Sequence, residues 1–171
     1  MNQSLANPNA PAALLSKETR KQIDHWVAKF PPEHQRSALI QGLMAAQHQN
    51  EGWLSRELIT AVADYLELPA AWAYEVASFY SMFALQPVGR HKINICTNIS
   101  CMLRGAEDMV AHAEDKLGIK LGQTTADGRI TLIREEECLA GCCGAPMMVV
   151  DGDYQENLTT EKFDAIIDEL D

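Results

Sequence analysis

The spacing of the cysteines constrains this chain more than any other feature. Four of the five cysteines form two pairs. The first pair is Cys96 and Cys101, in the segment Cys-Thr-Asn-Ile-Ser-Cys, and the second is Cys138 and Cys142, in Cys-Leu-Ala-Gly-Cys. Two short loops of this kind can supply two sulfurs each to one metal centre. The chain must then fold so that the two loops converge.

A [2Fe–2S] cluster takes four thiolates, two for each iron, which two such loops would provide from opposite sides. Gly141 and Gly144 in the second loop suit this arrangement, because glycine tolerates positive φ and close approach of the backbone. Backbone N–H groups in such loops can also donate to the sulfurs and tune the reduction potential. The pattern therefore favours a single [2Fe–2S] cluster.

Other uses of paired cysteines compete with this interpretation. A structural zinc site is the strongest alternative, although zinc cages usually have a two-residue spacing in at least one half, which is absent here. Disulfides are disfavoured, because no signal peptide is recognised and a reducing cytosol is expected. A thioredoxin-type redox pair needs Cys-x-x-Cys, and a Rieske centre needs two histidines in the loops, whereas His91 and His112 lie outside them. A structural zinc site therefore remains an alternative to the cluster.

The charge balance excludes some kinds of partner. The chain has 171 residues and a formal charge of -10, with 14 basic and 24 acidic residues. Nucleic acids and anionic membranes attract clustered lysine and arginine, so neither is an expected partner. The sequence has no apolar run of the roughly 20 residues that a transmembrane helix needs, so we expect a soluble chain without direct membrane insertion. No Gly-rich phosphate loop or Ser/His/Asp constellation is recognised, so no catalytic residues are assigned.

The sequence predicts a two-part, α+β chain. Residues 1–15 are rich in Asn, Pro and Ala and are expected to form a flexible arm. Residues 16–85 have apolar residues at helical spacing and predict a helical bundle. Residues 86–171 alternate strand and helix patterns and predict an α/β domain. The stretch Gln-Pro-Val-Gly-Arg at 86–90 marks the junction between the two.

Local signals set the expected helix ends in the first part. Ser16 and Ser55 are predicted N-caps, a second helix is expected to begin near Pro32, and Pro69 is expected at the start of a fourth helix. The three tryptophans and the methionines of this part are expected to pack in its core.

In the second part, the patterns predict the order β-α-β-β-β-α, close to that of a small thioredoxin-like α/β sandwich. Thr159 is the predicted N-cap of the last helix, and Asp151-Gly152 predicts a tight turn. The expected strands cover residues 91–95, 130–134, 147–150 and 154–157, and the first helix covers about 104–117. Both cysteine pairs begin just beyond strand ends, where sites in α/β sheets commonly form.

Several segments together resemble one family. Residues 49–55 (QNEGWLS), 76–83 (VASFYSMF) and 86–91 (QPVGRH) precede the two cysteine loops, and Gly-Ala-Pro follows at 144–146. This combination resembles the thioredoxin-like [2Fe–2S] subunit of respiratory NADH:quinone oxidoreductase, the E subunit of bacterial complex I. The resemblance covers about residues 16–171. It implies an N-terminal helical bundle followed by a thioredoxin-like domain that carries the cluster.

The resemblance implies further properties. Cys96, Cys101, Cys138 and Cys142 match the four cluster ligands. The implied partner is the larger subunit that binds FMN and NADH, with the rest of the peripheral arm, so that this chain exchanges single electrons with the flavin and has no complete active site alone. The implied location is cytoplasmic and peripheral to the inner membrane through the assembled complex. Two alternatives are an equivalent subunit of a NAD-dependent formate dehydrogenase or NAD-reducing hydrogenase, and a zinc-stabilised interaction module.

Two features lie outside this pattern. Cys143 has no place among four ligands and is expected to be a buried bystander thiol. Glu135, Glu136 and Glu137 directly precede Cys138, and their negative charges are expected to oppose reduction of a nearby cluster. Replacing all three with glutamine is therefore expected to raise the midpoint potential.

Overall fold

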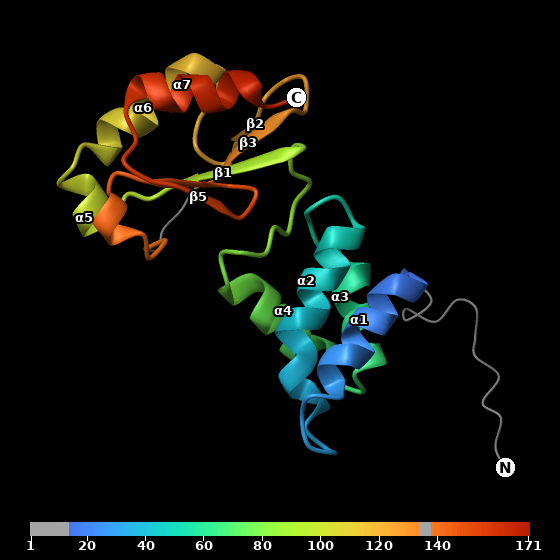
Figure 1. The fold of residues 1–171 in the computed structure, drawn as a ribbon. Helices are drawn as coiled ribbons and strands as arrows, with labels where there is room; N and C mark the ends of the chain where they lie inside the picture. Colours follow the sequence, from blue (N-terminus) through green and yellow to red (C-terminus); the bar gives the residue numbers. More distant parts are fainter. Residues whose placement is uncertain (1–13, 134–137) are drawn as a thin grey trace, which may run out of the picture. The chain divides into compact units, whose positions relative to one another are not determined.

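The computed structural model describes residues 14–133 and 138–171. They belong to two compact units that divide between Pro87 and Val88 (Figure 1). The first unit is helical, and the second is built on a sheet. No helix in the described part of the chain combines the length and the apolar character needed to cross a bilayer.

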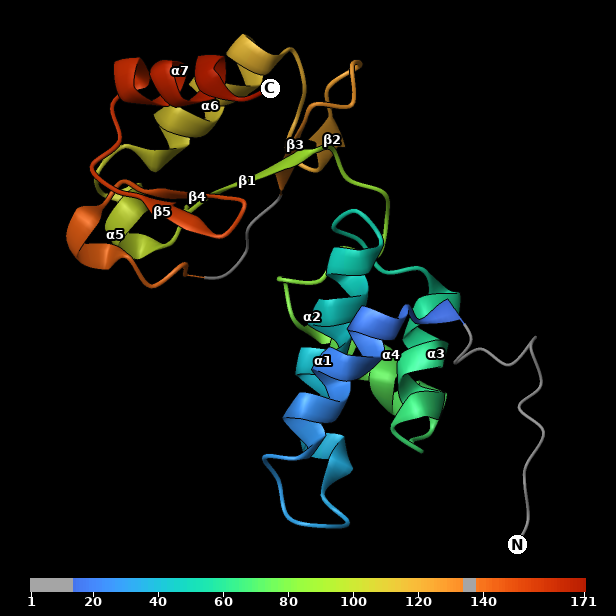
Figure 2. The ribbon, with the colours of Figure 1, turned by 45° about the vertical axis from the view of Figure 1, so that its right-hand side comes forward.

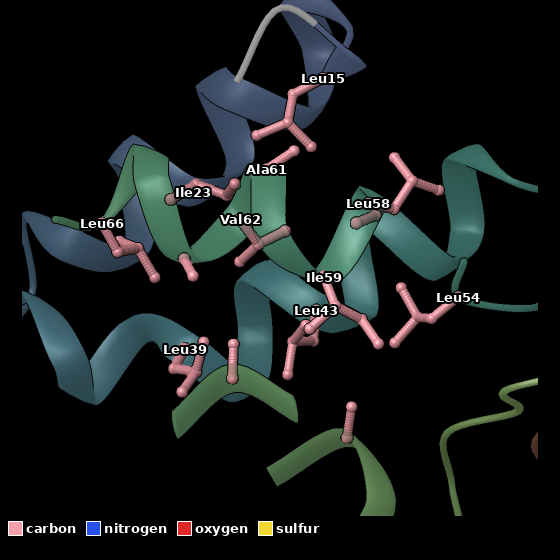
Figure 3. Packing of buried hydrophobic residues seen from close by; sticks show 14 of the residues in the cluster. Leu15, Ile23, Leu39, Leu43, Leu54, Leu58, Ile59, Ala61, Val62 and Leu66 are labelled. Atoms are coloured by element: carbon pink, nitrogen blue, oxygen red, sulfur yellow. The ribbon is translucent and has the colours of Figure 1, made fainter. Parts of the chain in front are cut away.

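Between Lys17 and Phe79 the first unit contains four α-helices and one short 3-10 helix (Figure 2). They are α1 (Lys17–Val27), η2 (Gln35–Ala38), α2 (Leu39–Gln49), α3 (Arg56–Tyr65) and α4 (Ala70–Phe79). Aliphatic side chains from several of these helices share one core, among them Ile23, Leu43 and Ile59 (Figure 3). Burying an aliphatic side chain of this size contributes about 1.5–3 kcal/mol, so this core holds the helices together.

The predicted helix starts in this unit are confirmed in part. The Ser16 hydroxyl accepts from the Thr19 N–H at 3.0 Å, and the Ser55 hydroxyl accepts from the Leu58 N–H at 3.2 Å, which confirms both predicted N-caps. The predicted helix start near Pro32 is wrong. Glu33 has φ of 72°, a left-handed conformation that an α-helix excludes, and α2 begins only at Leu39.

Helix α4 is apolar, yet its large side chains are exposed. It buries only Ala73 and Ala77, whereas Trp72 is 45% exposed and Phe79 is 74% exposed. The small alanines allow α4 to approach its neighbours closely and leave the aromatic rings on its outer side. The prediction that all tryptophans and methionines pack in the core is therefore wrong for Trp72, Met44 and Met82.

The second unit contains a five-stranded mixed sheet in the order β2-β3-β1-β4-β5. Its strands are β1 (His91–Ile95), β2 (Gln123–Thr124), β3 (Ile130–Ile133), β4 (Met148–Val150) and β5 (Asp153–Gln155). Strand β1 is central: it pairs parallel with β3 and antiparallel with β4. The outer pairs, β2 with β3 and β4 with β5, are antiparallel.

Helices α6 (Ala106–Leu117) and α7 (Thr160–Glu169) lie side by side against this sheet (Figures 1 and 2). Ile93 and Ile95 of β1 are buried in a core that includes Met109 of α6 and Phe163 of α7. The alternation of apolar residues in β1 thus places one side of the central strand under both helices. Two shorter helices, α5 (Ile99–Met102) and η3 (Cys142–Gly144), lie in the cysteine loops.

The remaining sequence predictions for this unit are confirmed in part. Asp151 and Gly152 have φ of 52° and 103° and form the predicted turn between β4 and β5. The Thr159 hydroxyl accepts from the Lys162 N–H at 3.2 Å, as expected of an N-cap. The predicted order lacked β2 and α5, because elements of two and four residues are too short to show periodicity. Arg134, predicted as the end of a strand, lies outside the described residues.

Candidate metal centre

The first cysteine loop begins directly after the central strand. Cys96 follows Ile95, and its backbone N–H donates to the Met147 carbonyl at 3.1 Å. The Asn98 side chain accepts from the Ile99 N–H at 3.0 Å and starts helix α5, which carries Cys101. Cys96 and Cys101 are 1% and 2% exposed. The strand and the short helix therefore place both thiols of this pair in the interior.

The second loop presents its thiols on the surface. Cys138 and Cys142 are both exposed, and their sulfur atoms lie 3.5 Å apart. In a tetrahedral thiolate site with metal–sulfur bonds of about 2.3 Å, two sulfurs lie about 3.8 Å apart. This pair therefore has the spacing of two ligands on one tetrahedral metal ion, and iron and zinc both fit that spacing.

The pKa shifts of Cys101 and Cys138 include contributions from thiols of the opposite loop. Burial raises the pKa of Cys101 to about 11, and a hydrogen bond with the Cys96 thiol and the charge of Cys142 add to the rise. The pKa of Cys138 is lowered, first by the Ala140 N–H and then by hydrogen bonds that include the Cys142 and Cys96 thiols. Sulfur atoms from opposite loops are thus close enough to interact directly.

The two loops thus contribute one thiol pair each, and thiols of the two pairs influence one another's pKa. Within the described residues, no three cysteine, histidine or carboxylate side chains converge on one point as the ligands of a single ion do. The sulfurs instead form two neighbouring pairs, one buried and one exposed. A [2Fe–2S] cluster needs two sulfurs on each of two irons, so this donor set fits such a cluster.

The second loop is packed closely against the chain that follows β5. A Cβ atom on Gly144 would lie 2.5 Å from the Glu156 side chain, closer than real carbon atoms approach. The Asn157 N–H donates to the Gly144 carbonyl at 2.6 Å, and the Leu158 N–H donates to the Pro146 carbonyl at 2.9 Å. The predicted close approach is thus confirmed at Gly144, whereas the positive φ in this loop, 63°, belongs to Ala140.

Other residues singled out in the sequence have different surroundings. Cys143 is exposed, so the prediction of a buried thiol is wrong: the 3-10 turn directs this residue to the surface. His91 and His112 form hydrogen bonds with Asp151 and Asp164 at 2.6 and 2.8 Å and lie outside the two loops. The acidic run at 135–137 lies outside the described residues.

Comparison with known proteins agrees with the fold and the cysteine geometry. Residues 23–171 match the model of the family "thioredoxin-like [2Fe-2S] ferredoxin". This match covers most of the chain, and the chain belongs to that family. The predicted thioredoxin-like fold and [2Fe–2S] cofactor type are thereby confirmed.

Several relatives are similar to this chain over most of its length. The E subunit of NADH-quinone oxidoreductase from Rickettsia bellii is 49% identical over 156 residues, which are 91% of this chain and 93% of the relative. The corresponding protein of Rickettsia felis is 48% identical over 155 residues, 91% and 92% of the two chains. A mitochondrial NADH dehydrogenase [ubiquinone] flavoprotein 2 from Dictyostelium discoideum is 38% identical, and the match covers 91% of this chain and 63% of that protein.

Solved structures include a similar part of a larger chain. The NAD+-reducing [NiFe]-hydrogenase in its air-oxidised state aligns with a TM-score of 0.62 and 26% sequence identity. The alignment covers 75% of this chain but only 22% of the hydrogenase chain. The present fold therefore recurs as a portion of a much longer polypeptide.

Proposed function

We propose that this chain is the E subunit of an NADH-quinone oxidoreductase and holds one [2Fe–2S] cluster. The proposed ligands are Cys96, Cys101, Cys138 and Cys142. The observation that carries this proposal is that a buried thiol pair and an exposed thiol pair, from loops far apart in the sequence, interact with one another. The 49% identity to a bacterial E subunit over nearly the whole chain supports the same assignment.

When bound, such a cluster supplies one-electron exchange. The protein's part is to hold and shield it. Cys96 and Cys101 anchor one side in the interior and exclude water there. The Ala140 N–H, 3.4 Å from the Cys138 sulfur, favours the thiolate and lowers the pKa of Cys138. Cys101, with its pKa raised to about 11, must release a proton when it binds metal.

The proposed partner is the subunit that binds FMN and NADH, together with the rest of the peripheral arm of the complex. This chain would bind neither FMN nor NADH itself, would have no catalytic residues of its own, and would be cytoplasmic and attached to the membrane only through the assembly. The exposed rings of Trp72 and Phe79 support a docking role for the helical unit, because large exposed apolar groups commonly mark protein contacts.

A second candidate function is favoured by the structural comparison. The same fold occurs in a NAD+-reducing [NiFe]-hydrogenase, so the chain could serve a soluble NAD-linked enzyme beside a similar flavin partner. The proteins that copurify with this chain distinguish the two functions. Quinone-reductase subunits are expected for the first, and hydrogenase or formate dehydrogenase subunits for the second.

The proposed function is tested by adding NADH to the cluster-loaded chain with and without the flavin subunit. The reduced-cluster signal in electron paramagnetic resonance (EPR) should form with NADH only when the flavin subunit is present, whereas dithionite should reduce the cluster in both samples. A cluster that dithionite reduces but that NADH never reduces in the mixture would contradict electron exchange with the flavin.

A further inference from the structure

Tyr154 reaches from strand β5 to the second cysteine loop. Its hydroxyl donates to the Leu139 carbonyl oxygen at 2.8 Å, although 15 positions separate the two residues. Leu139 lies directly after Cys138. The rest of this contact region uses backbone groups, at Asn157 with Gly144 and at Leu158 with Pro146. Tyr154 therefore supplies a side-chain hydrogen bond to the residue that directly follows Cys138.

The carbonyl that Tyr154 holds belongs to the same peptide group as the N–H that faces Cys138. The Leu139 carbonyl accepts from Tyr154, and the Ala140 N–H donates to the Cys138 sulfur at 3.4 Å. A trans peptide is planar, and its C=O and N–H point in opposite directions. Fixing the carbonyl on the tyrosine side therefore fixes the N–H on the sulfur side.

This peptide group needs such a restraint. Ala140 has φ of 63°, and a left-handed conformation costs a residue with a Cβ atom roughly 1–2 kcal/mol. A rotation of the Leu139–Ala140 peptide could relieve this strain and would turn the N–H away from the sulfur. The Tyr154 hydroxyl opposes that rotation, and by polarising the carbonyl it also strengthens the N–H as a donor.

We propose that Tyr154 is a positioning residue for the metal centre, which keeps the Ala140 N–H on the Cys138 sulfur. The inference rests on the proposed ligand set. A reduced cluster carries one more negative charge than an oxidised one, and an N–H donor to a ligand sulfur stabilises that charge and raises the potential. Loss of the Tyr154 hydroxyl should therefore lower the midpoint potential, even though Tyr154 is not itself a ligand.

The first test is a redox titration, monitored by EPR, of the full chain loaded with its cluster. In Tyr154→Phe we expect the equilibrium to shift about two- to tenfold toward the oxidised form, the effect of one net hydrogen bond. Tenfold corresponds to about 59 mV for a one-electron couple. Tyr74→Phe is the matched control, since Tyr74 is also exposed but lies on the separate helical unit. It should leave the midpoint unchanged.

A second measurement observes the N–H directly. Chains labelled with 15N-alanine should show a nitrogen hyperfine coupling to the reduced cluster in pulsed EPR. This coupling is assigned to Ala140 by its loss in Ala140→Gly, a substitution that suits the positive φ. In Tyr154→Phe the coupling should weaken or disappear. If the variant loads its cluster poorly, faster loss of iron to a chelator than from Tyr74→Phe is the expected result.

The outcomes separate the two proposals. A wild-type chain that takes up no [2Fe–2S] cluster would overturn the proposed function and the inference together. A loaded wild type with a Tyr154→Phe variant of unchanged midpoint, coupling and iron loss would overturn only the role of Tyr154.

Discussion

Cys142 and Cys143 are adjacent in sequence but differ in their surroundings. The Cys142 sulfur lies 3.5 Å from that of Cys138. Its pKa is raised chiefly by the hydrogen bond with Cys138, with a further contribution from the charge of Cys96. Cys143 is exposed, and the described contacts include none between it and another cysteine. These contacts support Cys142, rather than Cys143, as the proposed fourth ligand.

This difference gives a direct prediction. Cys143→Ser should keep about two irons per chain and an unchanged EPR signal, whereas Cys142→Ala should lose the four-thiolate cluster. Iron assay and EPR on the two purified variants check this result. Loss of the cluster from Cys143→Ser, with retention in Cys142→Ala, would exchange the roles assigned to the two thiols.

Tyr154 and Ala140 also show what residue patterns do not reveal. The four proposed ligands were singled out by their spacing, because chelation by two short loops imposes a spacing that is visible in the sequence. The contact between Tyr154 and Leu139 depends on where β5 lies relative to the second loop. The positive φ belongs to Ala140 rather than to a neighbouring glycine. The positions of the glycines therefore did not indicate where the left-handed residue lies.

At the scale of elements, the connection between β5 and α7 supports the second cysteine loop. Gly144 lies against Glu156, where an added Cβ atom would lie 2.5–2.6 Å from three side-chain carbon atoms. Gly144→Ala should therefore destabilise the chain by about 1–3 kcal/mol, the usual cost of overpacking. Urea unfolding followed by circular dichroism measures this change. Adding Glu156→Gly removes the obstructing atoms and should restore most of the loss; a double variant no more stable than Gly144→Ala would contradict the steric account.

Strand β1 and helix α4 should respond differently to truncation. Ile93 is fully buried at the centre of the sheet, so Ile93→Ala should cost about 2–5 kcal/mol of unfolding free energy. Phe79 is 74% exposed, and Phe79→Ala should change stability by no more than about 0.5 kcal/mol. Denaturant titrations of both variants check this contrast. A large loss of stability in Phe79→Ala would mean that its ring is buried in the folded chain.

The same two elements show which parts of the fold were predictable. The bounds of β1 were predicted correctly, because alternating isoleucines and a following cysteine mark both its face and its end. The apolar character of α4 could be predicted from the sequence, but the side of the helix that faces the core could not. Periodicity does not show that its alanines face the core and its aromatic rings face outward. Likewise, nothing in the sequence around Pro32 indicated the left-handed Glu33 that delays α2.

At the scale of the whole molecule, acid should destabilise the chain. A hydrogen bond from His112 and the nearby Lys116 ammonium lower the pKa of Asp164 below its ordinary value of 3.8. A hydrogen bond from Lys120 likewise lowers the pKa of Glu114. Because the folded-state values are lowered, the stabilisation is present above the ordinary carboxyl pKa and is lost as pH falls through the folded-state values.

The urea midpoint should therefore fall as the pH is taken from about 5 to about 2. In Asp164→Asn the fall should be shallower, since one contributing carboxylate is gone. Asp153→Asn is a suitable control, because Asp153 is an exposed carboxylate on β5, away from the ion pairs of α6 and α7. It should keep the slope of the wild type. Equal slopes for the wild type and Asp164→Asn would remove Asp164 from this explanation.

The proposed function requires that two cysteine loops of this chain hold one [2Fe–2S] cluster. Its most direct test is EPR of the purified, dithionite-reduced chain, with iron and zinc assayed on the same sample. We expect a spin-one-half signal and about two irons per chain. A colourless, EPR-silent protein with about one zinc bound by its four thiolates would leave the fold intact and contradict the electron-transfer function.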